Sequence, residues 1–294
     1  MFTLPSIKDE YKKDGVPCVR IENCGNFSVH KTFDCGQAFR FDPDGDDDTF
    51  TGTAFGKKIT FSSLGGGVVE LRGSTAEEYN TTWQRYLSLD SDYDEADRMI
   101  IEAMPNERDR AEMSAAVDSG RGIRILRQDP FETLISFIIS QNNNIPRIKK
   151  IISALCEKYG ENGAFPTADA LVKAGEEGIF ALKTGFRAGY IYDAAVKVKT
   201  GEVVLDDIAK CGDYEKCTDM LCSIKGVGPK VSSCVLLFGF GKTEAFPIDV
   251  WMKRSLALHF PDGFDPKPLG KYAGIAQQYM FYHERWINSE STKK

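Results

Sequence analysis

The sequence lacks several features that would assign it to a particular class of protein. No run approaches the roughly 20 apolar residues that a membrane span needs, and residues 1–10 are acidic, without the basic and then apolar pattern of a signal peptide. The 3 histidines are too scattered to form a histidine-based metal or nucleophile site. None of the 8 cysteines forms a CxxC pair. A membrane protein, a secreted protein and a conventional zinc protein are therefore poor interpretations.

Three cysteines lie near one another in the sequence. Cys211, Cys217 and Cys222 are spaced by six and five residues, which leaves a metal-thiol protein open as an alternative. Because the usual ligand motif is missing, we expect free thiols in a reducing compartment instead.

The charge is distributed unevenly along the chain. The net charge of −6 argues against a nucleic-acid partner, because proteins that bind phosphates are usually basic. However, residues 1–120 carry 13 Lys and Arg against 23 Asp and Glu, whereas residues 121–294 carry 24 against 20. Residues 121–150 alone carry six basic and two acidic side chains. This asymmetry indicates contact with nucleic acid or a membrane surface in the second half.

The first quarter of the chain has the pattern of β-structure. From about residue 15 to 73, short stretches alternate in polarity or are rich in aromatic and β-branched residues, and turn clusters at 42–48 and 65–67 separate some of them. Their close spacing predicts an antiparallel sheet. The predicted strands are residues 26–31, 37–41, 49–55, 58–62 and 68–72.

The rest of the chain has the pattern of helices. Asp129, Pro130 and Glu132 combine an N-cap, a proline at the first helical position and a capping-box glutamate. A second helix begins near Pro146 and ends at Gly160. We therefore predict an α+β protein, with an N-terminal antiparallel β domain over residues 1–115 and a helical domain over 116–294. Further helices fit residues 167–182, 188–199, 214–224, 229–238, 249–259 and 268–286.

Residues 214–238 predict two helices joined by a short turn. The turn contains Gly226, Val227 and Gly228, and the second helix begins at Pro229. The two glycines permit positive φ and a close approach of the backbone, and the helix N-terminus presents N–H groups that suit a phosphate. This helix-hairpin-helix pattern is typical of sequence-independent binding to a DNA backbone. A tight turn without a ligand is the alternative.

Two residues beside the hairpin suggest catalysis. Lys230 lies in the first turn of the second helix, and Asp249 follows nineteen residues later at the start of another helix. Taken alone, Lys230 is more often a surface lysine that contacts phosphate, and Asp249 an ordinary N-cap. Together with the hairpin, the pair favours an enzyme, because a protein that only binds DNA has no need of both.

With these residues in place, the sequence resembles the helix-hairpin-helix (HhH-GPD) DNA glycosylase superfamily. The lysine is typical of its bifunctional branch, and the resemblance is strongest to 8-oxoguanine DNA glycosylases of the eukaryotic type. Similar blocks follow the family order over nearly the whole chain, at residues 35–40, 140–147, 185–188 and 276–281. The related enzymes with an iron–sulfur cluster have four cysteines near the C-terminus, and the last sixty residues here contain none.

The resemblance implies a fold and a mechanism. The fold would be a TBP-like antiparallel sheet followed by two helical subdomains with the active site between them. Lys230 would attack the deoxyribose C1′ of a base rotated out of the duplex, forming a Schiff base, and β-elimination would then cut the strand. Asp249 would stabilise the positive charge that develops on the sugar, because such a transition state favours a fixed negative charge nearby.

The resemblance also implies how the base is recognised. N7 of 8-oxoguanine carries a hydrogen, whereas N7 of guanine accepts one, so a carbonyl group from Gly36 would select the damaged base. Gln277 would read the Watson–Crick edge, and Phe281 and Cys234 would cover the two faces of the ring. The alternatives are a hairpin glycine, a surface amide and core packing of Phe281 and Cys234.

A further group of residues would contact the opposite strand and the DNA backbone. Asn142, Arg147 and Arg187 match positions that bind the cytosine opposite the lesion, and Phe186 would wedge into the base stack. Trp251 stands where the family often has His, which puts one 5′-phosphate contact in doubt. The remaining residues expected at the DNA are Asn143, Gly226, Val227 and Gly228.

The expected partner is double-stranded DNA containing 8-oxoguanine opposite cytosine, bound by a monomer without a membrane. No cofactor and no metal ligand is expected, apart from room for a structural monovalent or calcium ion at the hairpin. The expected location is a bacterial or archaeal cytoplasm, at the nucleoid, or the nucleus of a eukaryote. The alternatives are a related glycosylase for another damaged base, such as an alkylated or formamidopyrimidine base, and a non-catalytic DNA-binding protein.

Overall fold

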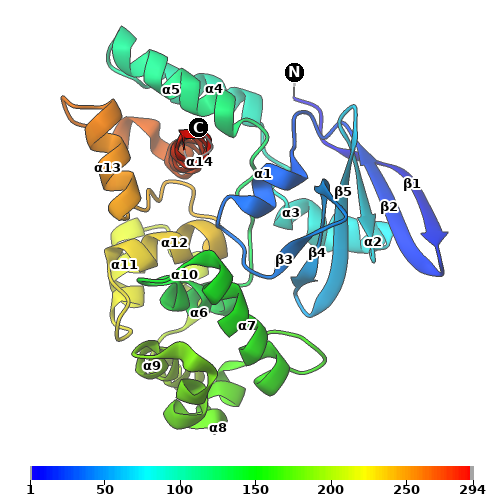
Figure 1. Cartoon of the computed structure of the whole chain (residues 1–294), viewed down its shortest axis with the longest axis vertical. Coiled ribbons are helices and arrows are strands. Elements are labelled where there is room, and N and C mark those ends of the chain that lie inside the picture. The colour runs from blue at the N-terminus through cyan, green and yellow to red at the C-terminus, as the bar shows by residue number, and fades with distance from the viewer. Residues whose placement is uncertain (1, 292–294) are drawn as a thin grey trace.

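The computed structural model describes residues 2–291 and has an α+β architecture (Figure 1). Within this range, six strands form one antiparallel sheet in the order β1-β2-β6-β5-β4-β3, and a body of helices follows. This confirms the predicted fold class. The strands are β1 (Ser6–Lys13), β2 (Val16–Glu22), β3 (Phe41–Asp44), β4 (Asp46–Ala54), β5 (Lys57–Gly65) and β6 (Val68–Arg72).

Two of the predicted strands are wrong. Residues 26–31 contain a turn and the start of helix α1 (Val29–Asp34), where the side chain of Ser28 accepts the backbone N–H of Lys31 at 3.2 Å. Of residues 37–41, only Phe41 belongs to a strand. Alternation over five or six residues does not distinguish a strand from a short helix whose buried residues are three and four apart. The structure places Val29 and Phe33 in the core in this way.

Aromatic rings join α1 to the sheet. The ring of Phe33 lies 4.4 Å from that of Phe41, 5.8 Å from that of Phe50 and 5.2 Å from that of Phe61, measured between centroids. Trp83 and Tyr86 belong to the same buried cluster. Figure 1 shows α1 lying between the sheet and the helical body. The loop that follows α1 is therefore carried to the boundary between the two parts of the molecule.

The helical body contains most of the remaining chain. Most predicted helices are found with shifted ends, but those at 167–182 and 268–286 are interrupted at Gly175 and Gly270, where φ is +69° and +51°. Helix α10 was not predicted. The helices are α2 (Ala76–Glu78), α3 (Gln84–Tyr86), α4 (Tyr93–Glu102), α5 (Glu107–Gly120), α6 (Pro130–Ser140), α7 (Ile145–Tyr159), α8 (Ala168–Ile179), α9 (Arg187–Thr200), α10 (Leu205–Lys210), α11 (Tyr214–Cys222), α12 (Pro229–Phe240), α13 (Val250–His259) and α14 (Ala273–Ser291). Short π-helical or 3₁₀ turns are η1 (Tyr79–Trp83), η2 (Phe180–Thr184) and η3 (Lys267–Tyr272).

Helices α4 and α5 pack with the C-terminal helix α14 (Figure 1). The hydroxyl of Tyr279 in α14 donates to Asp97 in α4 at 3.0 Å. A Cβ atom on Gly120 would lie 2.4 Å from the ring of Tyr279, so only glycine allows α5 this close to α14. Residues 93–120 thus share the core of the helical body. The boundary that we predicted between residues 115 and 116 falls inside α5.

The buried amide of Gln37 fixes the loop after α1. Its side chain is 1% exposed, and Nε2 donates to the carbonyl groups of Thr32 at 2.9 Å and Arg124 at 2.8 Å. Oε1 accepts the backbone N–H of Leu126 at 2.9 Å. The amide thereby ties the loop that contains Gly36 to the segment that leads into α6. Because all these partners are buried, the loop has a defined position relative to the helical body.

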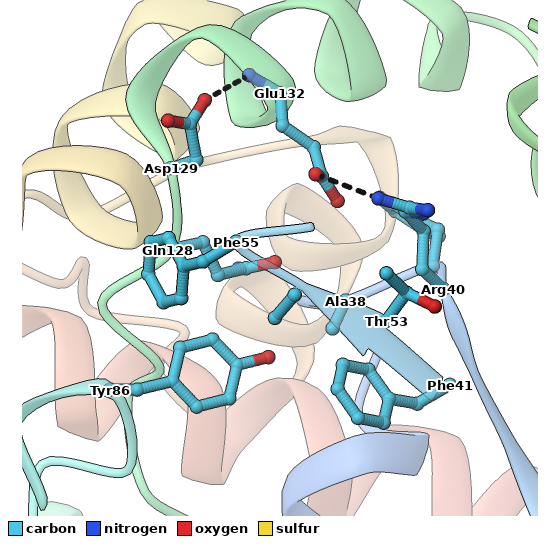
Figure 2. Close-up of a pocket in the computed structure, with 11 residues that line it drawn as sticks. Ala38, Arg40, Phe41, Thr53, Phe55, Tyr86, Gln128, Asp129 and Glu132 are labelled. Carbon is cyan, nitrogen blue, oxygen red and sulfur yellow. Dashed lines mark hydrogen bonds and ion pairs between the residues drawn. The ribbon is translucent and has the colours of Figure 1, made fainter. Parts of the chain in front are cut away.

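An ion pair connects the same two parts near the start of α6 (Figure 2). Asp129 caps α6 by accepting the backbone N–H of Glu132 at 2.8 Å, as predicted. The other half of the predicted capping box is wrong, because the Glu132 carboxylate accepts a hydrogen bond from Arg40 at 3.2 Å. Burial raises the pKa of Glu132 to about 7 from its ordinary value of 4.5, and the charge of Arg40 only partly offsets this.

This raised pKa makes stability depend on pH. A carboxyl group with a higher pKa in the folded than in the unfolded chain contributes stability fully below pH 4.5, and this contribution is lost as the pH rises through about 7. We therefore predict that, between pH 4.5 and 8, the free energy of unfolding of the wild-type protein falls by ~3 kcal/mol relative to that of Glu132→Gln. Urea denaturation across this range measures the difference. Glu102→Gln on the exposed face of α4 is the control, and a constant difference between wild type and Glu132→Gln would contradict the assignment.

Candidate active site

The hairpin between α11 and α12 has the predicted geometry and packs on α9. Gly226 has φ of +79°, and a Cβ atom there would lie 2.2 Å from the ring of Tyr190 in α9. The backbone N–H of Lys225 donates to Asp193, also in α9, at 2.8 Å. Glycine is thus required at position 226 both by its backbone conformation and by the neighbouring ring. Helix α9 holds the turn in place and thereby sets the start of α12.

Helix α12 begins with the backbone of Gly228 as its N-cap and Pro229 at its first position. No side chain caps this end, so the first N–H groups of α12 are left for other partners. Val227 is buried, and its own N–H donates to the carbonyl group of Ile224 at 3.0 Å within the turn. Its predicted contact with DNA stays a prediction, and neither its side chain nor its N–H group is free for it in this conformation.

A cavity of about 60 Å³ lies at the start of α12. It brings together residues that are far apart in the sequence, from the loop after α1, from α6, α12 and α14, and from the segment that leads into α13. All six residues predicted for catalysis and for the base pocket line it: Gly36, Lys230, Cys234, Asp249, Gln277 and Phe281. Sequence reasoning did not assign the other lining residues to the site, namely Cys35, Phe137, Phe238, Pro247 and Gln278.

The half-buried side chain of Lys230 lies over the aromatic rings on one side of the cavity. Its Nζ atom is 5.4 Å from the centroid of the Phe137 ring, which in turn stacks on Phe238 with centroids 5.4 Å apart. Burial raises the pKa of the Cys234 thiol one turn along α12, and the adjacent Lys230 opposes this effect. Aromatic rings thus cover one side of the amine.

Asp249 caps a helix and lines the cavity, and its expected role in stabilising charge on the sugar stays a prediction. It is the N-cap of α13, with Oδ1 accepting the backbone N–H of Met252 at 2.8 Å. It also lines the cavity that contains Lys230. The hydrogen bond to the helix fixes the orientation of the carboxylate. A fixed negative charge and a primary amine therefore face one small cavity, which is an arrangement suited to stabilising a cationic intermediate.

Gly36 in the loop after α1 and Phe281 in α14 lie close together in the cavity. Gly36 has φ of +81°, and a Cβ atom there would lie 3.8 Å from Cε1 of Phe281. That distance is an ordinary contact, so the backbone conformation, not lack of space, favours glycine. Phe281 comes from α14, together with the buried Gln277 one turn earlier. A planar group between the loop and α14 would meet a backbone segment, an aromatic face and an amide.

Two turns form a second predicted surface. Arg187 is 2% exposed, and its guanidinium donates to the carbonyl groups of Gln141, Asn142 and Thr184. It therefore joins the turn after α6 to the turn before α9. Burial lowers the pKa of Arg187, and Arg147 adds to this effect. The predicted contact of Arg187 with an opposing cytosine stays a prediction, because most of its donors already have partners.

The other residues of this surface differ in accessibility. Asn142 is exposed with φ of +47°, and Arg147 is exposed, with one contact to the carbonyl group of Lys183 at 3.3 Å. Asn143 uses its amide to donate to Ile139 at 3.0 Å. Phe186 is 56% exposed, and its ring lies 4.4 Å from the guanidinium carbon of Arg187, measured to the ring centroid. Asn142, Arg147 and Phe186 are thus available to a partner, and Asn143 is engaged in the turn.

For some of the cavity-lining residues that the sequence analysis did not assign to the site, the sequence contains a pattern that could have indicated them. Phe137 lies in α6, whose long apolar run is typical of a helix buried in a core. Gln278 is three residues before Phe281, which is a spacing that places both on one side of a helix. Trp251 is exposed and borders a neighbouring cavity that shares Phe281 with the first.

The expectation that the cysteine cluster holds no metal stays a prediction. Among the side chains that the structure describes, which leave out 47 and 286–291, no group of three or more His, Cys, Asp or Glu is placed to hold a metal ion. The buried thiol of Cys217 contacts the carbonyl groups of Ile208 and Cys211 at 3.7 and 3.6 Å. Within residues 2–291, no helix has both the length and the apolar character needed to cross a membrane.

Comparison with known proteins extends the match over both parts of the chain. Residues 21–134 match the N-terminal domain of 8-oxoguanine DNA glycosylase, and residues 135–268 match the HhH-GPD superfamily of base excision DNA repair proteins. The chain is 39% identical to the N-glycosylase/DNA lyase of Saccharomyces cerevisiae over 155 residues, 46% of this chain and 41% of the yeast protein. It is 31% identical to the probable N-glycosylase/DNA lyase of Methanothermobacter thermautotrophicus over 210 residues, 59% of this chain and 67% of the archaeal protein.

The chain spans about half the length of the curated relatives it matches. The match to a solved structure is more complete. The 8-oxoguanine glycosylase/lyase of Clostridium acetobutylicum, in complex with double-stranded DNA containing cytosine opposite 8-oxoguanine, is 35% identical, with 98% of this chain and 99% of that chain covered and a TM-score of 0.85. The two family matches and this similarity over the full length show that the chain belongs to the 8-oxoguanine DNA glycosylases of the HhH-GPD superfamily.

Proposed function

We propose that this protein removes 8-oxoguanine from double-stranded DNA and then cuts the strand at the resulting abasic site. One observation carries the proposal: Lys230 and Asp249 line a single cavity with Gly36, Gln277 and Phe281. The cavity therefore joins a nucleophile and a negative charge to groups that suit a flipped base. The glycosylase/lyase activity stated for the clostridial and yeast relatives supports the same function.

The proposed reaction begins at the sugar. The neutral amine of Lys230 attacks C1′, the bond from C1′ to N9 breaks, and the base leaves with the bonding electrons and takes up a proton. The positive charge that develops on the sugar is stabilised by Asp249. Ring opening gives a Schiff base between Lys230 and C1′. Loss of a proton from C2′ and of the 3′ phosphate then breaks the strand by β-elimination.

Base selection follows from hydrogen-bond polarity. We propose that the backbone carbonyl group of Gly36 accepts the N7 hydrogen of 8-oxoguanine and repels the N7 lone pair of guanine. Gln277 reads the Watson–Crick edge, while Phe281 and Cys234 cover the two ring faces. The apolar neighbours Phe137 and Phe238 exclude water, which strengthens each of these interactions.

The opposite strand is read by the two turns beside α6. We propose that Arg147 and Asn142 bind the cytosine left unpaired and that the exposed ring of Phe186 fills the gap in the stack. Phe137 and Asn142 are five residues apart on α6 and its following turn, which connects the base cavity to this surface. Arg187 stabilises the turn after α6 through hydrogen bonds to its backbone carbonyl groups. It would reach the cytosine only if these hydrogen bonds rearranged.

Two alternatives fit the residues less well. A glycosylase for an alkylated base needs no carbonyl group aimed at a hydrogen on N7, so the loop of Gly36 favours the oxidised purine. A non-catalytic DNA-binding protein would need neither Lys230 nor Asp249 at a buried cavity. Comparing excision from a duplex that contains 8-oxoguanine with excision from a duplex that contains an alkylated base decides between the proposal and the first alternative.

We propose that the reaction needs no cofactor, because an amine and a carboxylate of the protein supply the nucleophile and the charge. Residues 224–228 contain no carboxylate, so a cation at the hairpin would be held by main-chain carbonyl groups and would serve structure. The proposed form is a monomer at chromosomal DNA, in the nucleoid of a bacterium or archaeon or in the nucleus of a eukaryote.

The nucleophile is tested by covalent trapping. Borohydride reduces a Schiff base to a stable amine, so wild-type protein incubated with 8-oxoguanine duplex in EDTA is expected to form a cross-linked complex. Lys230→Gln is expected to form none, because it has no nucleophilic amine. Lys173→Gln, on an exposed part of α8, is the control and should trap as wild type does. Trapping by Lys230→Gln at an unchanged yield would refute the role of Lys230.

The role of Asp249 is separable from its role as a helix cap. Asparagine is about as good an N-cap as aspartate, so Asp249→Asn is expected to keep the stability of α13. It removes the negative charge, and we expect single-turnover excision to fall by about 100-fold or more. Thermal denaturation and single-turnover kinetics measure the two effects. Excision within threefold of wild type would mean that the charge is not used.

Opposite-base recognition is tested with 8-oxoguanine placed opposite each of the four bases. A good pair of hydrogen bonds to one base discriminates by about 1–3 kcal/mol, so Arg147→Ala is expected to reduce the preference for cytosine by roughly tenfold. Lys150→Ala in the same helix is the matched control. An unchanged preference in Arg147→Ala, with cutting of a preformed abasic site also unchanged, would exclude Arg147 from this role.

A further inference from the structure

Arg285 in α14 forms an ion pair with the residue at which α1 ends. Its Nη2 atom lies 3.3 and 3.2 Å from the two carboxylate oxygens of Asp34, and Nη1 donates to the backbone carbonyl group of the same residue. One guanidinium therefore holds both the side chain and the main chain of Asp34. Because Gly36 follows only two residues later, this contact joins α14 to the start of the loop that lines the cavity.

Neither helix needs this ion pair in order to form. A carboxylate in the last turn of a helix is unfavourable, because the free carbonyl groups there carry partial negative charge. Among the described residues, the carboxylate of Asp34 accepts hydrogen bonds only from Arg285. The two side chains are 47% and 41% exposed, and an ion pair this exposed adds little to the stability of a fold. What the contact provides is a defined position of one segment against another.

The loop is also held at its other end. The buried amide of Gln37 binds the segment that leads into α6, as described above. Between Asp34 and Gln37 lie only Cys35, which is buried, and Gly36. The backbone of Gly36 is thus fixed on one side to α14 and on the other side to the helical body near α6. With both neighbours held, its carbonyl group has little freedom to move relative to the cavity.

The helix that holds the loop also supplies the groups opposite it. Gln277, Phe281 and Arg285 are four residues apart in α14, so they lie on one side of the helix. A Cβ atom on Gly36 would lie 3.8 Å from the ring of Phe281, which shows how near the loop approaches α14. A flipped base must fit with one face on Phe281 and its N7 edge at the backbone of Gly36. The separation of the loop from α14 therefore decides whether both contacts form at once.

We infer that Arg285 is a positioning residue: by holding Asp34, it keeps the backbone of Gly36 at the distance from Phe281 at which 8-oxoguanine is bound and its N7 hydrogen is read. This inference rests on the proposed function of the cavity. Arg285 itself need not touch the base. A loop that is already ordered lowers the entropic cost of binding the base.

Hydrogen–deuterium exchange in the free protein tests whether Arg285 holds the loop. Arg285→Met keeps an unbranched apolar side chain and removes the guanidinium. We expect the peptide that covers residues 33–39 to exchange about fivefold faster in this variant, because the loop opens more often once it is released from α14. Arg98→Met removes an equally exposed ion pair in α4 and is the matched control, with no change expected in this peptide. Unchanged exchange in Arg285→Met would overturn the inference.

Kinetics test whether the held loop serves base recognition. We expect kcat/KM for 8-oxoguanine opposite cytosine to fall about tenfold in Arg285→Met, because a displaced loop no longer places its carbonyl group at N7. Arg285→Lys is expected to lose less, since an ammonium keeps the charge but lacks the fork that holds side chain and main chain together. Cutting of a preformed abasic site, which contains no base to place, should stay within twofold of wild type. An equal loss of abasic-site cutting, or no loss of excision, would contradict the inference.

A double-mutant cycle assigns the effect to the contact with Asp34. Asp34→Ala is expected to cause a smaller loss of excision than Arg285→Met, because the bond from Arg285 to the backbone carbonyl group remains. Asp34→Ala/Arg285→Met is expected to be no worse than Arg285→Met alone, and additive losses would show that the two residues act separately and would refute the inference. If the wild-type protein failed to excise 8-oxoguanine, the proposed function itself would be wrong, whereas the exchange measurement would still report whether Arg285 holds the loop.

Discussion

The candidate site depends on one buried amide, that of Gln37. Its hydrogen bonds to Thr32, Arg124 and Leu126 tie the loop after α1 to the segment that enters α6. The loop contributes Gly36 to the cavity, whereas the helical body contributes the lysine, the aspartate and the glutamines. A cavity built from both parts of a chain requires that they keep a fixed relation, and a buried amide with several partners imposes one because each lost bond would leave a polar group unpaired.

Several residues serve the fold and the site at once. Asp249 caps a helix and lines the cavity, and Gly226 allows both the tight turn and the approach of α9. Arg187 is the opposite case, because a residue expected at the DNA has most of its donors bonded to the backbone of the turn it supports. Residues can serve both purposes because a rigid turn holds the groups next to it in place, so that they need not be ordered again for each substrate.

The charge distribution agrees with this organisation. Acidic residues are concentrated in residues 1–120, most densely in residues 74–120 after the last strand, and the basic excess lies in residues 121–294, where the two turns and the hairpin occur. A DNA face with a small excess of positive charge suits a protein that contacts phosphates through N–H groups of helix N-termini. The net charge of the whole chain therefore says little about its partner, while the distribution of the charge along the chain is informative.

The sequence by itself determined the fold class, the hairpin, most helices and the six residues that meet in the cavity, because glycine, proline and capping patterns act over a few residues and the family blocks are specific. It misidentified residues 26–31, whose helix is stabilised by packing Phe33 on the sheet, and it paired Glu132 with the wrong partner, since Arg40 is distant in sequence. It gave no role to Phe137 or Gln278. Only the tertiary structure decided which buried side chains face the cavity and which partner each polar group takes, because both depend on contacts between segments that lie far apart along the chain.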